Sequence, residues 1–227
     1  MKAKFSLCYR LLGLLVSAGG VALHMSADKV VEVGFMIRHK LAYFTIQTNI
    51  FAVLLFGYLL WKTLRSRGRT LAKVPPSLHL GVTFLITMTM LGFWLLLEPS
   101  TGNTEVPLVY ISSLILHTFT PLLVIGDYVL FADHGRVTRA DAAKWLIYPV
   151  GYLIFVMLFS LTIREPYYSF QMNGKTVELM YPYPFLDPSV MGPWGVAGAV
   201  LGLALVFWLF GLLWVWIDGL LAKKKTR

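Results

Sequence analysis

A stripe of polar side chains runs along one face of an otherwise apolar segment between residues 106 and 131. Its members fall within an arc of roughly 80° at helical spacing: Ser113, His117, Thr120 and Asp127. Pro121 cannot donate a hydrogen bond to the carbonyl of His117, four residues earlier, which predicts a kink in the helix. A histidine inside an apolar helix is often only a hydrogen-bonded core residue, but the stripe and the kink also suit a general base.

A second polar cluster lies in the apolar segment 41–61. Thr45, Thr48 and Asn49 share one helical face through their i, i+3 and i+4 spacing. Such residues commonly hold helices together in membrane bundles. Thr45 lies in the outer third of its segment and His117 a little deeper in the fourth segment. From these depths we expect Thr45 and His117 to face each other within about 6 Å, in a cavity between these two segments.

The remaining polar residues are expected to support this pair. Asn49 lies one turn from Thr45, where it is placed to donate to an oxyanion that forms beside that hydroxyl. Pocket support is expected from three others: Thr48, Ser113 and Thr120. The other histidines lie at segment ends or in loops and are expected to be solvated: His24, His39, His79 and His134. With one cysteine and scattered histidines, the sequence shows no metal-ligand spacing and no cofactor motif.

Two charged residues, Arg10 and Asp127, lie inside apolar segments. Each is four or five residues from the inner end of its segment, which places both roughly 6–8 Å below the same membrane surface. A lone charge at that depth is costly, and an aspartate is too short to reach the headgroups. We predict a structural salt bridge that joins the first and fourth segments, because Arg10 is the one cation expected at that depth.

The composition sets the class of elements that carry these residues. Of 227 residues, 57% are hydrophobic and 14% are charged, and the mean hydropathy is +0.70, whereas soluble domains average about 25% charged. This excludes a soluble globule and a disordered chain. Apolar runs of about 20 residues predict six membrane-spanning helices: Phe5–Met25, Leu41–Trp61, Leu78–Glu98, Val106–Phe131, Ala143–Ile163 and Met191–Ile217. The prediction is an all-α integral membrane protein with one six-helix domain over 1–227.

The loops differ in charge. Most of the 20 Lys and Arg residues lie on one side of the predicted helices, including the basic run 62–73 and the tail 223–227. The positive-inside rule then places both termini in the cytoplasm. The net charge of +9 is therefore interpreted as topology and as contact with anionic lipid, not as nucleic-acid binding. The outer loop 164–190 is rich in Tyr, Pro and Phe and is predicted to pack over the mouth of the bundle.

Three motifs resemble the androgen-induced and androgen-dependent family of multi-pass membrane proteins and its bacterial relatives. They are YFTIQTN from Tyr43, LHTFTPLLVIGDYVLF from Leu116 and YPYPFLD from Tyr181. Their order and spacing are similar to that family's over most of the chain. Animal members hydrolyse fatty acid esters of hydroxy fatty acids with a Thr nucleophile and a His. By motif position, the resemblance implies these roles for Thr45 and His117, and we expect a protein of the bacterial cytoplasmic membrane.

Two classes of function stay open. The first is an intramembrane hydrolase without a cofactor, whose partners are a lipid or fatty-acyl ester and the membrane lipids. In it, Thr45 attacks the ester and His117 takes the proton. The second is a non-enzymatic membrane protein, either a small transporter or a lipid-binding scaffold, because intramembrane polar stripes serve transport equally well. The sequence sets neither the physiological ester nor the oligomeric state.

Overall fold

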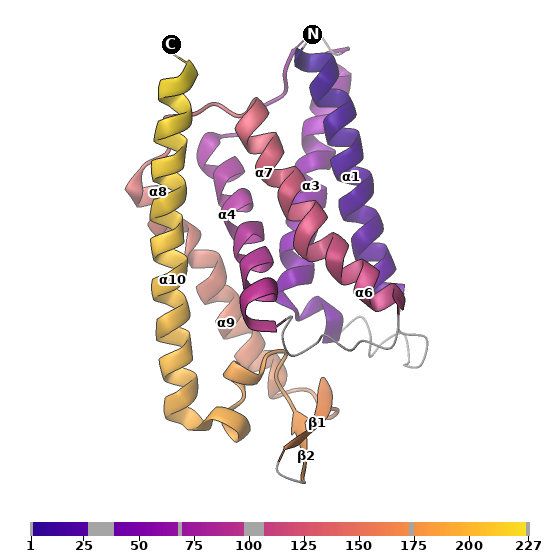
Figure 1. The fold of residues 1–227 in the computed structure, drawn as a ribbon, viewed down its shortest axis with the longest axis vertical. Helices are drawn as coiled ribbons and strands as arrows, with labels where there is room; N and C mark the ends of the chain where they lie inside the picture. The colour runs from indigo at the N-terminus through magenta and orange to yellow at the C-terminus, as the bar shows by residue number, and fades with distance from the viewer. Residues whose placement is uncertain (1, 27–38, 68–69, 98–106, 173–174, 226–227) are drawn as a thin grey trace.

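The computed structural model describes residues 2–26, 39–67, 70–97, 107–172 and 175–225. Within them the protein is helical apart from one hairpin and short turns, and six helices are long and apolar enough to cross a membrane. Figure 1 shows these helices as one bundle, with both termini at one end and the hairpin at the other. The predicted fold class is confirmed, and the chain is an integral multi-pass membrane protein by the length and composition of its helices.

The first half of the chain contains three long helices. They are α1 (Lys2–Ser26), α3 (Phe44–Arg65) and α4 (Pro76–Gly92), and α4 continues as the π-helix η1 (Phe93–Leu97). Pro76 begins α4, where a missing N–H costs no intrahelical hydrogen bond. The second helix begins at Phe44 and not at Leu41, so Thr45 lies in its first turn.

The second half contains the other three spans. The fourth consists of α6 (Pro107–Leu114), the π-helix η2 (Ile115–Phe119) and α7 (Thr120–Phe131), and the fifth of α8 (Arg139–Trp145) and α9 (Ile147–Ser160). The hairpin β1 (Tyr168–Met172) and β2 (Lys175–Leu179), the 3-10 turn η3 (Pro184–Leu186) and α10 (Pro188–Lys225) complete the chain. α10 bends at Gly192, whose φ of 67° suits glycine before Pro193. It also runs beyond the predicted end at Ile217, so it includes Asp218.

Helix α4 lies in the middle of the bundle and α10 on its outside (Figure 1). α4 packs against α3, α7, α8 and α10, and most of its membrane-length stretch is buried, whereas α10 is largely exposed along its length. α1 packs closely against α3, because Gly13 lies against Phe56: a Cβ at residue 13 would be 2.6 Å from that ring. The elements α3, α4 and η2 also contact one another, so their polar faces meet in the interior of the bundle.

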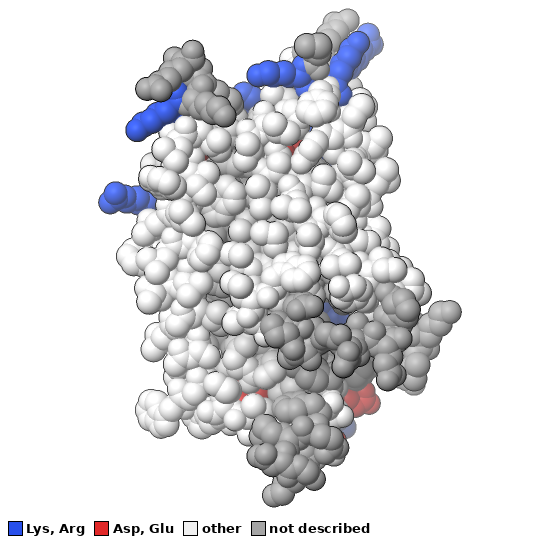
Figure 2. All heavy atoms as spheres, in the orientation of Figure 1, with Lys and Arg blue, Asp and Glu red and all other residues white. Residues whose placement is uncertain are grey.

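The surface separates charged from apolar regions. Figure 2 shows Lys and Arg gathered at the end of the bundle where both termini lie, above a broad band almost free of charged residues. Large apolar side chains such as Leu201 and Trp216 of α10 are exposed, as a lipid-facing surface requires. The distribution agrees with the orientation that the loop charges predict.

The segment 164–190 covers the end of the bundle opposite the termini, as predicted. Its strands β1 and β2 pair antiparallel, and the turn after them packs inward. There, Tyr183 and Leu186 join Tyr152 and Val156 of α9 in one buried cluster. This segment therefore brings residues that follow the hairpin into contact with the polar outer ends of α3 and α9.

Candidate active site

The hydroxyl of Thr45 lies 3.1 Å from Nε2 of His117. Thr45 comes from the first turn of α3 and His117 from the middle of η2. The two side chains therefore meet, inside the expected 6 Å and at hydrogen-bonding distance. His117 is 7% exposed and Thr45 is half-buried, so the imidazole is shielded from bulk solvent.

The other nitrogen of the imidazole fixes the direction of this hydrogen bond. Nδ1 of His117 lies 2.8 Å from the backbone carbonyl oxygen of Ser113. A carbonyl oxygen only accepts, so Nδ1 carries the ring proton and Nε2 holds the lone pair in the neutral ring. The hydroxyl of Thr45 then donates to Nε2, which is the arrangement of a nucleophile and its general base. Ser113 acts here through its backbone and not through its hydroxyl.

The kink predicted at Pro121 takes the form of a π-helical turn. The amide of Thr120 bonds the carbonyl of Ile115, five residues earlier, because Pro121 lacks the N–H that would continue the regular ladder. π-Helical turns within α-helices are frequent at functional sites. The ring of His117 stacks on Phe93, the first residue of η1, with centroids 4.0 Å apart and planes at 15°. The widened turn η2 thus carries the imidazole, and the widened turn η1 packs Phe93 against a face of its ring.

Hydrogen bonds from Asn49 join α3 and η2, the helices that carry Thr45 and His117. Its Nδ2 donates to the carbonyl oxygens of Thr45, at 2.9 Å, and Leu116, at 3.2 Å. Both amide protons are therefore committed to backbone groups, which leaves none for the oxyanion role considered from the sequence. Thr48 supports the same turn, since its hydroxyl donates to the Thr45 carbonyl at 3.1 Å. The hydroxyl of Thr120 is buried, and the described residues offer it no hydrogen-bond partner.

A cavity of about 200 Å³ opens beside Thr45. It lies among α4, α9, α10 and η3, and its lining is almost entirely apolar, with Phe93, Leu153 and Phe207 among its walls. The cavity was expected between the second and fourth spans with His117 in its wall. The structure corrects this: Thr45 lines the cavity and His117 does not, although Nε2 of His117 lies beside the Thr45 hydroxyl.

The segment around Tyr183 closes the outer end of this cavity. Tyr183 lines it together with Thr45, and the backbone N–H of Phe44 donates to the Tyr183 hydroxyl oxygen at 3.2 Å. Asp187 fixes the fold of the segment by accepting from the amides of Met180, at 3.0 Å, and Ser189, at 2.9 Å. Burial raises the pKa of Tyr183 to about 12, so its phenol is neutral at physiological pH. Sequence reasoning expected this loop over the pocket but gave Tyr183 no role.

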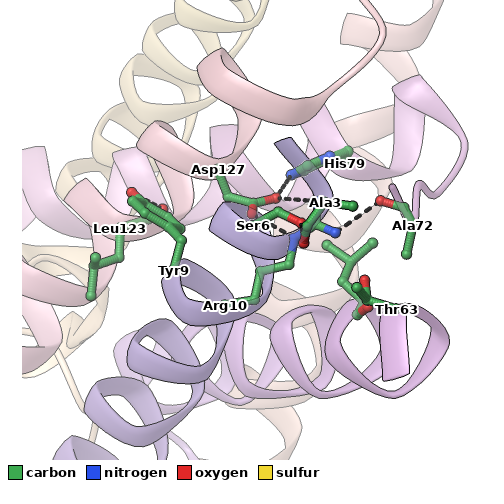
Figure 3. Close-up of polar contacts among 10 residues, drawn as sticks. Ala3, Ser6, Tyr9, Arg10, Thr63, Ala72, His79, Leu123 and Asp127 are labelled. Atoms are coloured by element: carbon green, nitrogen blue, oxygen red, sulfur yellow. Dashed lines mark hydrogen bonds and ion pairs between the residues drawn. The ribbon is translucent and has the colours of Figure 1, made fainter. Parts of the chain in front are cut away.

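The predicted bond between the first and fourth spans is present near the end of the bundle that carries the termini (Figure 3). Nε of Arg10 lies 2.8 Å from Oδ1 of Asp127, and a second guanidinium nitrogen lies 3.3 Å from Oδ2. Arg10 also donates to the carbonyl oxygen of Ala72 at 2.9 Å. His79 was expected to be solvated but is 2% exposed, with Nε2 3.2 Å from Oδ2 of Asp127, off the axis of a well-aligned hydrogen bond.

A second buried carboxylate lies at the same end of the bundle. Asp218 of α10 accepts from the Tyr128 hydroxyl at 2.5 Å and from the Gly135 amide at 2.8 Å, and Nδ1 of His134 lies 3.3 Å away. The sequence missed this cluster because it ended the last span one residue too early. His134 is therefore a contact between the loop after α7 and α10, and not a solvated side chain.

The two remaining histidines are also partnered. His24 lies 2.9 Å from the Ser112 hydroxyl, and His39 lies 3.2 Å from the Glu165 carbonyl. Both join separate parts of the chain, so the expectation that they are merely solvated was wrong. Among the described residues, no group of three or more His, Cys, Asp or Glu side chains could hold a metal ion.

Comparison of the chain with protein families, with curated proteins and with solved structures finds no match. Membership of the family that the three motifs resemble therefore stays a prediction from those motifs.

Proposed function

We propose that this protein is an intramembrane hydrolase of lipid esters, with Thr45 as nucleophile and His117 as general base. The observation that carries the proposal is the hydrogen bond from the Thr45 hydroxyl to Nε2 of a histidine whose other nitrogen is held by Ser113. A threonine hydroxyl is a weak nucleophile unless a base removes its proton, and this geometry supplies the base.

The reaction runs in two halves. Thr45 Oγ1 bonds to the ester carbonyl carbon while its proton passes to Nε2 of His117, and the carbonyl π electrons move onto oxygen. Collapse of this oxyanion expels the alcohol, which takes the proton from Nε2 and leaves an acyl-threonine. Water then attacks the acyl carbon as His117 takes its proton, and the fatty acid leaves with Thr45 restored.

The surroundings favour a lipid substrate. The cavity beside Thr45 is almost entirely apolar, so it suits an acyl chain rather than a sugar or a peptide. A site on helices that span a membrane is supplied from the bilayer, and this indicates an ester that partitions into lipid. The charge of its loops supports a topology with both termini in the cytoplasm, and the resemblance of the three motifs implies a bacterial cytoplasmic membrane.

The test is a screen of purified protein in detergent against lipid esters, including fatty acid esters of hydroxy fatty acids. Thr45→Ala and His117→Ala should each abolish turnover and also labelling by a fluorophosphonate probe. Thr118→Ala is the matched control. The hydroxyl of Thr118 accepts a hydrogen bond from Trp94, so this variant should leave turnover and labelling unchanged. Turnover retained in Thr45→Ala would overturn the mechanism, and absence of labelling together with uptake by proteoliposomes would instead favour a transporter.

A further inference from the structure

The proposed hydrolysis needs a donor for the oxyanion, and the sequence candidate Asn49 has no proton to offer. The donor must come from the wall of the cavity, because the ester carbonyl has to lie against Thr45. Among the described residues, four hydroxyl-bearing side chains line it: Thr45, Thr89, Tyr152 and Tyr183. Thr45 is the nucleophile, so three remain.

Two of the three hydroxyls already donate elsewhere. Tyr152 donates to the backbone carbonyl oxygen of Ala42 at 2.8 Å. Thr48 gives its proton to the carbonyl of Thr45. The Thr89 hydroxyl lies 2.7 Å from the Thr48 hydroxyl and 3.3 Å from the carbonyl oxygen of Leu85, so its proton is engaged in one of these two bonds. The protons of Tyr152 and Thr89 are thus engaged in holding the bundle together.

Tyr183 differs because its bond to Phe44 uses the oxygen and not the proton. The N–H of Phe44 donates to the phenol oxygen at 3.2 Å, so this bond leaves the O–H proton of Tyr183 unused. A hydrogen bond accepted at the oxygen strengthens the phenol as a donor. Phe44 and Thr45 also begin α3, where the helix dipole favours negative charge.

The ring of Tyr183 is held in place for this role. It stacks on Phe185 with centroids 5.2 Å apart and planes at 4°, and its edge meets Tyr43 at 5.9 Å. The residue is 8% exposed. A donor that is fixed before the reaction needs no reorganisation when charge develops, and this makes such groups effective.

We infer that Tyr183 is a catalytic residue that donates a hydrogen bond to the substrate carbonyl oxygen as Thr45 attacks. This inference rests on the proposed function and names the missing group of that same site. No covalent bond to Tyr183 forms or breaks. The electron pair of the carbonyl π bond moves onto oxygen, and the phenol and the start of α3 stabilise the charge until the alcohol leaves.

The test compares Tyr183→Phe with Tyr181→Phe in the purified full-length protein. Tyr183→Phe should lower kcat about 100- to 1,000-fold, as loss of one oxyanion donor does elsewhere, while KM changes little. Tyr181 does not line the cavity, so Tyr181→Phe should keep wild-type kcat. Fluorophosphonate labelling, which builds charge on a phosphoryl oxygen, should slow in Tyr183→Phe alone.

The outcomes separate the two proposals. If Thr45→Ala is inactive but Tyr183→Phe keeps kcat within a few-fold of wild type, the role of Tyr183 is overturned and the hydrolase stands. If wild type and Thr45→Ala behave alike, the hydrolase itself fails. Should Tyr183→Phe unfold, 3-fluorotyrosine at position 183 keeps the ring and changes only the donor strength. Its kcat should then shift several-fold, and an unchanged kcat would overturn the role.

Discussion

Asn49 of α3 donates to the backbone carbonyl oxygen of Leu116, the residue before His117, at 3.2 Å. The same amide nitrogen bonds the carbonyl of Thr45. One side chain thereby sets the separation of the nucleophile and the base, without contact to either reacting atom. Its part in the proposed reaction is positioning.

We expect Asn49→Ala to reduce both stability and turnover. It removes two hydrogen bonds to backbone carbonyl groups, although the Thr45 carbonyl keeps Thr48 as a donor, and this costs about 1–3 kcal/mol in the free energy of unfolding. It also frees η2 to shift relative to α3, so kcat should fall more than KM changes. Thermal denaturation in detergent and ester hydrolysis measure the two effects.

Gln47→Ala is the control for that change. Gln47 donates to the Leu41 carbonyl and accepts from Tyr148, so its loss also removes two hydrogen bonds of α3 but none at the pair. It should lower stability and leave kcat near wild type. Equal losses of kcat in both variants would show that Asn49 has no specific positioning role.

The pair of Arg10 and Asp127 predicts a non-additive effect on stability. Arg10→Met or Asp127→Leu alone leaves an uncompensated buried charge, which costs about 3–5 kcal/mol. The double variant leaves no uncompensated buried charge and should be more stable than either single variant. His79 provides Asp127 with a second contact, so Arg10→Met should cost less than Asp127→Leu. Additive losses in unfolding experiments would contradict the coupling.

The pKa of Tyr183 gives a prediction for the pH dependence of catalysis. Burial raises this pKa to about 12 from its ordinary value near 10, so the neutral phenol persists to higher pH. The ratio of kcat between wild type and Tyr183→Phe should therefore stay level from pH 7 to pH 10. With an ordinary tyrosine pKa, half of the donor would be ionised at pH 10 and the ratio would fall about two-fold.

Helical periodicity was sufficient to identify the reacting pair but not its surroundings. Thr45, His117, Arg10 and Asp127 could be predicted because a polar residue in an apolar helix needs a partner, and depth limits the choice. The position of Tyr183 and the cavity could not be predicted from the sequence, because both depend on how the segment after the hairpin folds back onto α9 and α10. Nor does periodicity show which donors are already used, as at Asn49.

The larger groove of the bundle offers a direct control for the assignment of the substrate cavity. A groove of about 890 Å³ between α3, α4 and α9 is lined by Gly151 and lacks Thr45, whereas Gly92 lines the smaller cavity that contains Thr45. A Cβ at either glycine meets no atom within 4 Å, so each position has room for a leucine beside the adjacent hollow.

Gly92→Leu should therefore discriminate between acyl chains, and Gly151→Leu should not. Burial of each CH₂ group contributes about 0.8 kcal/mol, so excluding two or three from the cavity lowers kcat/KM about tenfold or more. We expect this loss for palmitoyl esters and little change for butyryl esters in Gly92→Leu, and wild-type values for both in Gly151→Leu. Steady-state hydrolysis of a series of chain lengths measures it. If Gly151→Leu alone affected long chains, the acyl chain would lie in the larger groove, and the cavity beside Thr45 would not be the substrate site.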